Sequence, residues 1–436
     1  MHKDLKNKYY LEWIDFLKQS EHWNREKINK YQFRKIQEII KLAYQKTLGY
    51  KNLYSKNNIS PKDIKTLDDF YNLPFSSKEI IHENLENFSI RVKKREYVTT
   101  GGSTGIPFGF YRDSESFAKE LASKAYQYYR VGWKEGDRQM VFRGLPIGTK
   151  DRMEFFPEYN ELRCSSYYLT DRQMNKYLER AWKFRPDFIK SYPSSIYIFA
   201  KFLKENNKIF PPIKAILCAS ENLYDFQKTL LREVFKCRVF SHYGHYEMSV
   251  LAGYCEYNDS YHVLPQYGFA ELINQEGKHV SKIGETGQIV ATSFIMKATP
   301  FIRYRTGDLA VFGGWGCKDC GRPYQIWKKI EGRLQEFVVT RKNRLISMTS
   351  INMHDNIFDN LIQFQFYQEK KGEIVFKYIP RRKIKSSEVE KIKSRLLKKF
   401  GNDIVLYMKD VEEIPVTKRG KHRFLIQKLN LKYGDD

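Results

Sequence analysis

The chain has 436 residues, of which 42% are hydrophobic and 15% aromatic, and its formal net charge is +25. This apolar fraction is enough for a large folded core and excludes a mostly disordered chain. No apolar run approaches membrane-spanning length, and the N-terminus is charged and aromatic, unlike a secretory signal. We therefore expect a cytoplasmic protein of two or three domains, whose basic surface favours anionic ligands.

The positive charge raises the question of nucleic-acid binding. The lysines are spread along the whole chain and interleaved with Asn, Ile and Tyr, without one dominant tract. A solvated lysine face is therefore the simpler interpretation of any single cluster. Nucleic acid is the less favoured partner, and salt-dependent retention on DNA or RNA would distinguish it.

The first part of the chain, to about residue 90, has the apolar periodicity of helices. A β-prone run then ends at a loop made of Thr100, Gly101, Gly102, Ser103, Thr104 and Gly105. The backbone N–H groups and hydroxyls of such a loop can converge on a polyphosphate, because glycine lets the backbone come close. No Gly-Lys-Ser/Thr sequence closes the loop, so it is not a Walker loop, and an ordinary surface turn is the alternative.

Strands and helices alternate in the next part of the chain. Helices are predicted over 114–129, 171–184, 196–204 and 224–235, with short strands at 139–142, 188–192, 213–218 and 239–244. This alternation implies right-handed crossovers and a mostly parallel sheet, with ligands at the carboxyl ends of the strands. Three features fall at the carboxyl ends of predicted strands: the glycine loop, the Ala219-Ser220-Glu221 turn and the Tyr243-Gly244 pair.

Beyond residue 264 the pattern changes to short strands and turns, and after Arg333 to a smaller unit with a helix predicted over 387–400. The predicted fold class is therefore α/β. Residues 1–333 form a large N-terminal domain, with mostly parallel sheets flanked by helices and a small β-rich part. Residues 334–436 form a small, mobile α+β C-terminal domain.

Five motifs follow one another in a recognisable order: TTGGSTGIPF, SHYGHYE, IRYRTGDL, IEGRLQEF and VTKRGKHR. In this order the chain resembles the adenylate-forming ligases, and within them the branch of phenylacetate–CoA ligase and the CapK-like proteins of capsular polysaccharide biosynthesis. The resemblance covers nearly the whole chain. It implies an enzyme that activates a small carboxylic acid with ATP and Mg²⁺, forming acyl-AMP and pyrophosphate. The acyl group then passes to coenzyme A, or to an amine or hydroxyl acceptor, and the resemblance suggests a homodimer.

The resemblance also assigns roles in nucleotide binding. The loop Thr100–Gly105 would hold the β- and γ-phosphates. The Ala219-Ser220-Glu221 turn would line the adenine, and Tyr243, beside Gly244, would stack on its ring. Asp308 would accept hydrogen bonds from the ribose hydroxyls, and Arg333 would lie near the ribose or a phosphate.

Two charged residues would serve the reaction itself. Glu247 matches the carboxylate that holds Mg²⁺, a cation that prefers oxygen ligands. Lys421 matches a lysine that stabilises charge on the substrate carboxylate and the α-phosphate. Without the resemblance, Glu247 is a solvated glutamate at a helix start and Lys421 one more lysine of a basic tail. At the hinge position, Gln335 replaces the aspartate of many relatives, which leaves the transfer to coenzyme A less firmly implied.

The six cysteines of a cytoplasmic chain are not expected to form disulfides. Cys317-x-x-Cys320 has the spacing of a zinc knuckle, and Cys255 and His262 can complete a tetrahedral structural Zn²⁺ site. Free buried thiols with a surface histidine are the alternative. Two other functions also stay open: a non-catalytic nucleotide-binding scaffold of polysaccharide assembly, and a zinc-containing basic nucleic-acid-binding protein.

Overall fold

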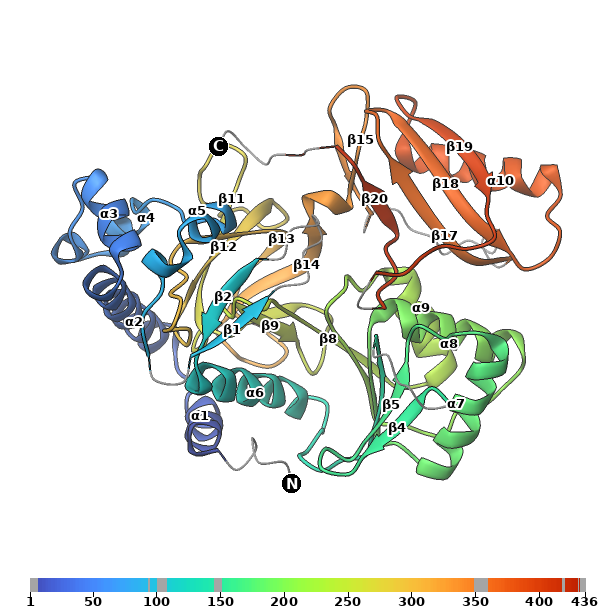
Figure 1. The fold of residues 1–436 in the computed structure, drawn as a ribbon, viewed down its shortest axis with the longest axis horizontal. Helices are drawn as coiled ribbons and strands as arrows, with labels where there is room; N and C mark the ends of the chain where they lie inside the picture. Colours follow the sequence, from blue (N-terminus) through green and yellow to red (C-terminus); the bar gives the residue numbers. More distant parts are fainter. Residues whose placement is uncertain are drawn as a thin grey trace. The chain divides into compact units, whose positions relative to one another are not determined.

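The computed structural model describes residues 7–92, 95–99, 108–144, 151–348, 360–417, 420–429 and 431. They form two compact units, each assembled from two stretches of chain (Figure 1). The first unit contains residues 1–136 and 242–330, and the second contains residues 137–241 and 331–434. The chain passes from one unit to the other at three points: between Gly136 and Asp137, within β8 (Arg238–Gly244) and within β14 (Gln325–Arg333).

The first unit begins with helices whose ends are set by polar caps. Asn24 accepts a hydrogen bond from the Lys27 backbone N–H at the start of α2, and Asp113 accepts one from Ser116 at the start of α6. Trp13 of α1 donates to Ser123 of α6 at 2.9 Å, so these two helices pack together. The helices are α1 (Lys8–Gln19), α2 (Arg25–Lys46), α3 (Leu48–Lys56), α4 (Leu67–Tyr71), α5 (Lys78–Glu83) and α6 (Ser114–Tyr129).

The sheet of the first unit is antiparallel in the pairings β11–β12, β12–β13, β14–β10, β10–β9 and β9–β8. Its other strands are β9 (Leu251–Tyr254), β10 (Tyr261–Val263), β11 (Gly268–Ile273), β12 (Thr286–Ser293) and β13 (Tyr304–Trp315). A separate hairpin joins β1 (Glu96–Thr99) to β2 (Gly109–Arg112), with Thr99 opposite Gly109. The predicted phosphate loop, Thr100–Gly105, falls between these strands in the sequence and lies outside the described residues.

The second unit contains the predicted parallel sheet. Strands β8, β7, β6, β3 and β5 run parallel in that order, and β4 pairs antiparallel at the edge. The helices beside them in Figure 1 bury apolar residues such as Tyr177, Phe199 and Leu231 against the strands. The elements are β3 (Gln139–Arg143), β4 (Met153–Phe156), β5 (Glu161–Ser165), α7 (Asp171–Phe184), β6 (Phe188–Ser191), α8 (Pro193–Glu205), β7 (Ala215–Cys218) and α9 (Asp225–Phe235).

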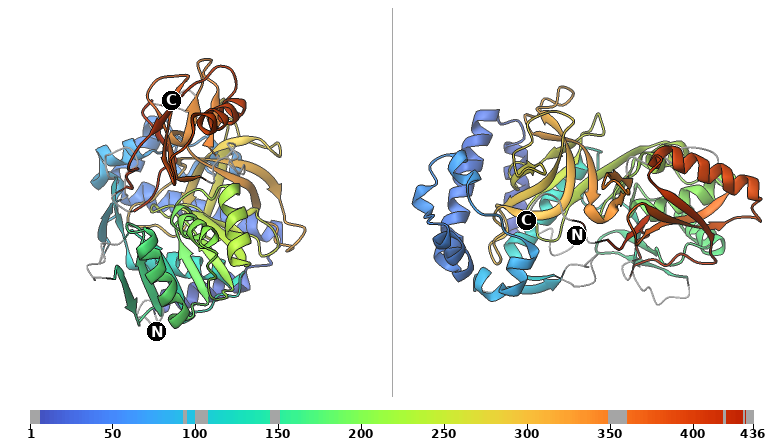
Figure 2. Two further views of the ribbon diagram at one scale, coloured as in Figure 1. Left: turned by 90° about the vertical axis from the view of Figure 1, so that its right-hand side faces the viewer. Right: turned by 90° about the horizontal axis from the view of Figure 1, so that it is seen from above.

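A four-stranded sheet in the order β19-β18-β17-β20 forms the C-terminal part of the second unit. Helix α10 runs along this sheet (Figure 2), and its Leu396 and Phe400 are buried in one cluster with Phe366 and Phe376. The elements are β15 (Phe337–Val339), β16 (Leu345–Ser347), β17 (Leu361–Gln368), β18 (Glu373–Pro380), α10 (Ser386–Phe400), β19 (Val405–Asp410) and β20 (Leu425–Gln427).

The predicted α/β class is confirmed, as a mixed fold in which helices flank a large sheet and a small β-rich part lies at the C-terminus. The helices over 114–129 and 171–184 have their predicted bounds. The domain limit between residues 333 and 334 stays a prediction, because residues 331–434 group with 137–241. None of the helices in the described part of the chain is long and apolar enough to cross a membrane.

Candidate active site and cysteine cluster

Two of the predicted nucleotide-binding residues lie together in the first unit. Tyr243, beside Gly244 at the end of β8, donates its hydroxyl to Asp308 of β13 at 2.7 Å. The Asp308 backbone N–H is bonded to the Thr306 hydroxyl at 3.1 Å, and its side chain is largely buried. Trp327 packs edge-on against the Tyr243 ring. The aromatic ring of Tyr243 and the carboxylate of Asp308 therefore lie side by side in fixed positions, as recognition of a nucleoside would require.

Glu247 follows in a turn after β8 and is held from both sides. Its Oε2 lies 2.9 Å from Nδ1 of His245, and its Oε1 accepts from the Tyr304 hydroxyl at 3.2 Å. Nε2 of the same histidine lies 3.0 Å from the Ser249 hydroxyl. The Glu247 side chain keeps 11% of its surface exposed. The carboxylate is thus oriented, and its role as a magnesium ligand remains a prediction.

The second unit brings together two motifs that are 201 residues apart in the chain. Nζ of Lys421 donates to the Ser220 carbonyl at 2.7 Å, just beyond the carboxyl end of β7. The ammonium also lies 5.2 Å from the centre of the Tyr192 ring. Gly420 has φ +69°, and a Cβ there would come within 2.6 Å of Gly144 and of Ser166. Only glycine therefore fits this turn, and the turn sets the position of Lys421.

The remaining residues of the 219–221 turn are anchored by their neighbours. The Ala219 N–H donates to the Ser191 carbonyl at 3.4 Å, and Glu221 accepts from the Ser194 backbone at 2.9 Å and its hydroxyl at 3.1 Å. Burial raises the pKa of Glu221 to about 7, although the Ser194 bonds and the charge of Lys421 act in the opposite direction. This carboxyl group can therefore change its charge near neutral pH.

Arg333 ends β14 in the Gly-Arg motif. Gly332 has φ +83°, and a Cβ there would lie 2.2 Å from the Asn222 amide and 2.3 Å from the Glu336 carboxylate. These two side chains are hydrogen-bonded to each other at 2.5 Å. Glycine is thus required next to Arg333, whose contact with a ribose or phosphate remains a prediction.

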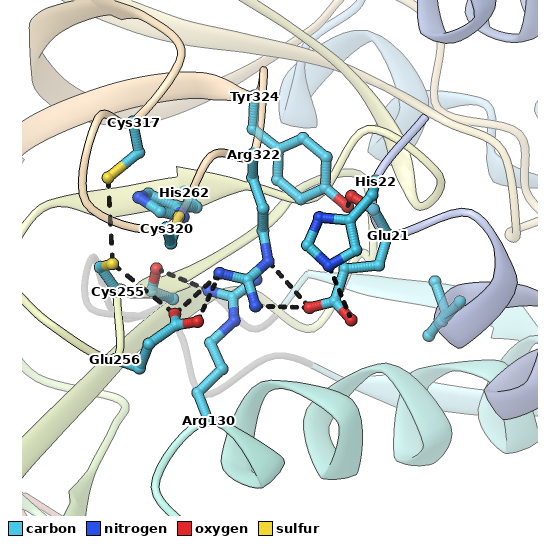
Figure 3. A network of polar contacts seen from close by, with 12 residues as sticks. Glu21, His22, Arg130, Cys255, Glu256, His262, Cys317, Cys320, Arg322 and Tyr324 are labelled. Carbon is cyan, nitrogen blue, oxygen red and sulfur yellow. Dashed lines mark hydrogen bonds and ion pairs between the residues drawn. The ribbon is translucent and has the colours of Figure 1, made fainter. Parts of the chain in front are cut away.

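The four predicted zinc ligands converge in the first unit (Figure 3). Their ligand atoms all lie within 4.8 Å of one another. The Sγ atoms of Cys255 and Cys317 are 3.9 Å apart, and Sγ of Cys320 is 3.8 Å from Nδ1 of His262. The β9–β10 hairpin supplies Cys255 and His262, and the turn after β13 supplies the other two.

The donor set fits a structural zinc ion. A tetrahedron with Zn–S bonds of about 2.3 Å places its sulfurs roughly 3.8 Å apart, close to the spacing found here. His262 is fully buried, and its Nε2 has no hydrogen-bond partner among the described residues. Burial lowers the pKa of His262 to about 3, with further lowering by Arg130 and Arg322, which keeps the imidazole neutral as a metal ligand requires.

A buried arginine links this cluster to the N-terminal helices (Figure 3). Arg322 donates to both carboxylate oxygens of Glu256 at 2.8 Å, and its Nε donates to Glu21 at 2.8 Å. Glu21 lies in the connection between α1 and α2, and Tyr324 donates to the Glu21 carbonyl at 3.0 Å. The knuckle turn is therefore tied to the N-terminal helical hairpin.

Several of these polar residues were not singled out by the sequence patterns. His245 and Ser249 flank Glu247 within five residues, and a histidine beside a candidate metal carboxylate could have signalled the contact. Arg322 follows the knuckle closely, but its partner Glu21 is 301 residues away and has no local signature.

The chain is similar to several known proteins. Residues 337–428 match the family model described as the CapK C-terminal domain. The chain is 26% identical over 396 residues to protein CapK of Staphylococcus aureus, which covers 87% of this chain and 85% of that protein. It is 22% identical to a phenylacetate-coenzyme A ligase of Pseudomonas putida over 72% of each chain.

The predicted resemblance is confirmed. Among solved structures, a 2-hydroxyisobutyryl-CoA ligase in the postadenylation state, in complex with R3-HIB-AMP, aligns with a TM-score of 0.75. The alignment covers 93% of this chain and 91% of that one at 16% identity. At this identity the likeness establishes a shared fold, that of the adenylate-forming ligases.

Proposed function

We propose that this chain is an acyl-adenylate-forming ligase that activates a small carboxylic acid with ATP and then transfers the acyl group to coenzyme A. One contact carries the proposal: Lys421 reaches the Ser220 carbonyl, so the two motifs predicted to serve one nucleotide meet within the second unit. The Tyr243–Asp308 bond supports it in the first unit. The relative named phenylacetate-coenzyme A ligase points to the same chemistry.

The reaction has two steps. A carboxylate oxygen of the acid attacks the α-phosphorus of ATP, the bond to the bridging oxygen of the β-phosphate breaks, and pyrophosphate leaves. Lys421 neutralises charge on the attacking carboxylate and the α-phosphate, while Tyr243 and Asp308 hold the nucleoside in place. The coenzyme A thiol then loses its proton to solvent and attacks the acyl carbonyl, the bond from the acyl carbon to the phosphate oxygen breaks, and AMP leaves.

The metal ions have separate places in this proposal. Glu247 would hold Mg²⁺, which offsets the negative charge of the phosphates when it is bound. Cys255, His262, Cys317 and Cys320 would hold a structural Zn²⁺, because four protein ligands leave no open position for a substrate. About one zinc per chain, lost on Cys317→Ser, is expected by metal analysis; substoichiometric zinc that this change does not alter would contradict the site.

Carboxylate-dependent release of pyrophosphate over a panel of acids tests the activity. We expect Lys421→Ala to lower the rate by about 10²–10³-fold, the usual effect of losing a group that stabilises transition-state charge. Glu247→Ala should lower it too, whereas Lys409→Ala, at an exposed lysine of β19, should leave it unchanged. Equal rates in the wild type and both site variants would remove the assignment of these residues.

The products of the reaction distinguish the possible acyl acceptors and the alternative functions. Thioester formed only when coenzyme A is added identifies it as the acceptor, and acyl transfer to an amine or hydroxyl of a sugar would instead support a place in surface-polysaccharide biosynthesis. ATP binding without turnover on any acid would favour the scaffold. Retention on nucleic acid without pyrophosphate release would favour the nucleic-acid-binding alternative. The homodimer stays a prediction that sedimentation can test.

A further inference from the structure

The turn that carries Glu247 contains a chain of hydrogen bonds that the proposed reaction does not use. Ser249 Oγ lies 3.0 Å from Nε2 of His245, whose Nδ1 lies 2.9 Å from Oε2 of Glu247. All three residues belong to the first unit. The His245 side chain is 8% exposed, and Ser249 is fully buried.

The chemistry of the carboxylate sets the direction of the bond between His245 and Glu247. An ionised carboxylate only accepts hydrogen bonds, so Nδ1 of His245 carries the proton and donates to Glu247. Nε2 of His245 lies within hydrogen-bond distance of the Ser249 hydroxyl, which can donate or accept a hydrogen bond. Ser249 therefore fixes the orientation of the His245 ring, and His245 fixes one oxygen of Glu247. The Tyr304 hydroxyl fixes the other oxygen at 3.2 Å.

A serine, a histidine and an acid in this order also resemble a hydrolytic triad, but burial excludes that role. A nucleophilic hydroxyl must face its substrate, whereas Ser249 has no exposed surface. Its neighbourhood is packed: the preceding carbonyl, of Met248, accepts from Ser293 at 2.6 Å, and the Ser249 carbonyl would lie 2.2 Å from a Cβ at Gly268. Of the three side chains, Glu247 keeps the most exposed surface, 11% against 8% for His245.

We propose that His245 is a positioning residue that holds Glu247 in the orientation needed to bind a divalent cation together with ATP, and that Ser249 sets the orientation of His245. This inference rests on the proposed function, in which Glu247 is the cation ligand. Hydrogen-bond partners behind a metal ligand typically change metal affinity by about 10–100-fold, because they fix the ligand's direction and basicity.

Mn²⁺ binding in the presence of a non-hydrolysable ATP analogue, followed by electron paramagnetic resonance, tests the inference on the full chain. We expect His245→Ala to weaken Mn²⁺ binding by about 10–100-fold. His245→Asn keeps a donor near the position of Nδ1 and should recover most of the affinity, and Ser249→Ala should give a smaller loss. Binding of the analogue without a cation should not change.

The outcomes separate this inference from the proposed function. Unchanged Mn²⁺ affinity in His245→Ala overturns the inference alone, as does a loss that follows each variant's melting temperature instead of the presence of the donor. Weakened Mn²⁺ binding in His245→Ala, with no pyrophosphate release by the wild type on any acid, overturns the function and leaves the inference standing. Failure of the wild type to bind Mn²⁺ with the analogue overturns both.

Discussion

Glu221 lies in the turn that Lys421 contacts. Folding destabilises the ionised form of its carboxyl group. Burial raises its pKa to about 7, against an ordinary value of 4.5. The Ser194 backbone and hydroxyl accommodate the carboxylate, and Lys421 supplies a positive charge, but they do not restore the hydration that the group loses. An ionisable group beside a proposed catalytic lysine therefore lowers stability at neutral pH.

We expect Glu221→Gln to be more stable than the wild type by an amount that depends on pH. Because the folded pKa is raised, the unfolded chain releases the proton first, so the wild type loses stability as pH rises from about 4.5 to about 7. The advantage of Gln should grow over this range, reach about 1–3 kcal/mol, and level off above pH 7. Urea unfolding of both proteins from pH 5 to pH 8 measures it. A difference that is constant with pH would contradict the raised pKa.

At the scale of elements, the knuckle turn and the N-terminal hairpin support each other. Arg322 joins Glu256 to Glu21, and Arg25 of α2 donates to the Pro323 carbonyl at 3.4 Å. Gln266 donates to the Ser20 carbonyl at 3.2 Å on the same connection. The α1–α2 connection thus depends on a turn that two of the zinc ligands would hold in place.

Arg322→Met should lower the free energy of unfolding by about 2–3 kcal/mol, since it leaves two partly buried carboxylates without their cation. Burial alone would raise the pKa of Glu256, but a hydrogen bond from its own backbone and then the bonds from Arg322 hold that pKa below its ordinary value. That part of the stabilisation is present above the ordinary pKa of glutamate and is lost as pH falls through the lowered pKa of Glu256. Denaturant titration at pH 7 and pH 4 measures the change. Lys328→Met, at an exposed residue of β14, is the control and should have little effect.

Loss of zinc should loosen the N-terminal hairpin. We expect Cys317→Ser, or chelation of the wild type, to speed limited proteolysis around residues 20–24, because the turn that anchors Glu21 loses its metal. Cys237→Ser is the matched control, since this thiol lies in the second unit, outside the four-residue cluster. Faster cleavage throughout the chain, or equal cleavage in Cys317→Ser and the control, would contradict the coupling.

These examples show what sequence patterns can predict. The helix over 171–184 has its predicted bounds because its apolar positions repeat with the helical period and a threonine caps it. The role of Lys421 is predicted from the resemblance to the adenylate-forming ligases, and its ammonium contacts the Ser220 carbonyl. The bond between Arg322 and Glu21 could not be predicted, because a single charged pair separated by 301 residues has no periodicity or spacing.

At the scale of the whole molecule, the chain order does not match the compact units. Residues 331–434 share an apolar cluster with α9 of the parallel-sheet region. The ring of Phe424 packs edge-on against Tyr224 at 5.3 Å and Phe226 at 5.9 Å, and it lies 5.2 Å from Phe364 of β17. A domain boundary at residue 333 would divide this cluster between two domains. No pattern along the sequence can reveal contacts of this kind.

Phe424→Ala should therefore destabilise two parts of the chain at once. Removal of a largely buried phenylalanine typically costs about 3–5 kcal/mol, and here the lost contacts belong both to α9 and to the C-terminal sheet. Hydrogen exchange of backbone amides should accelerate in α9 as well as in β17 and β20. Phe400→Ala is the control, because Phe400 of α10 packs on Phe366 of β17, and it should leave α9 unaffected. If exchange in α9 does not respond to Phe424→Ala, the shared core is contradicted and the limit between residues 333 and 334 is favoured.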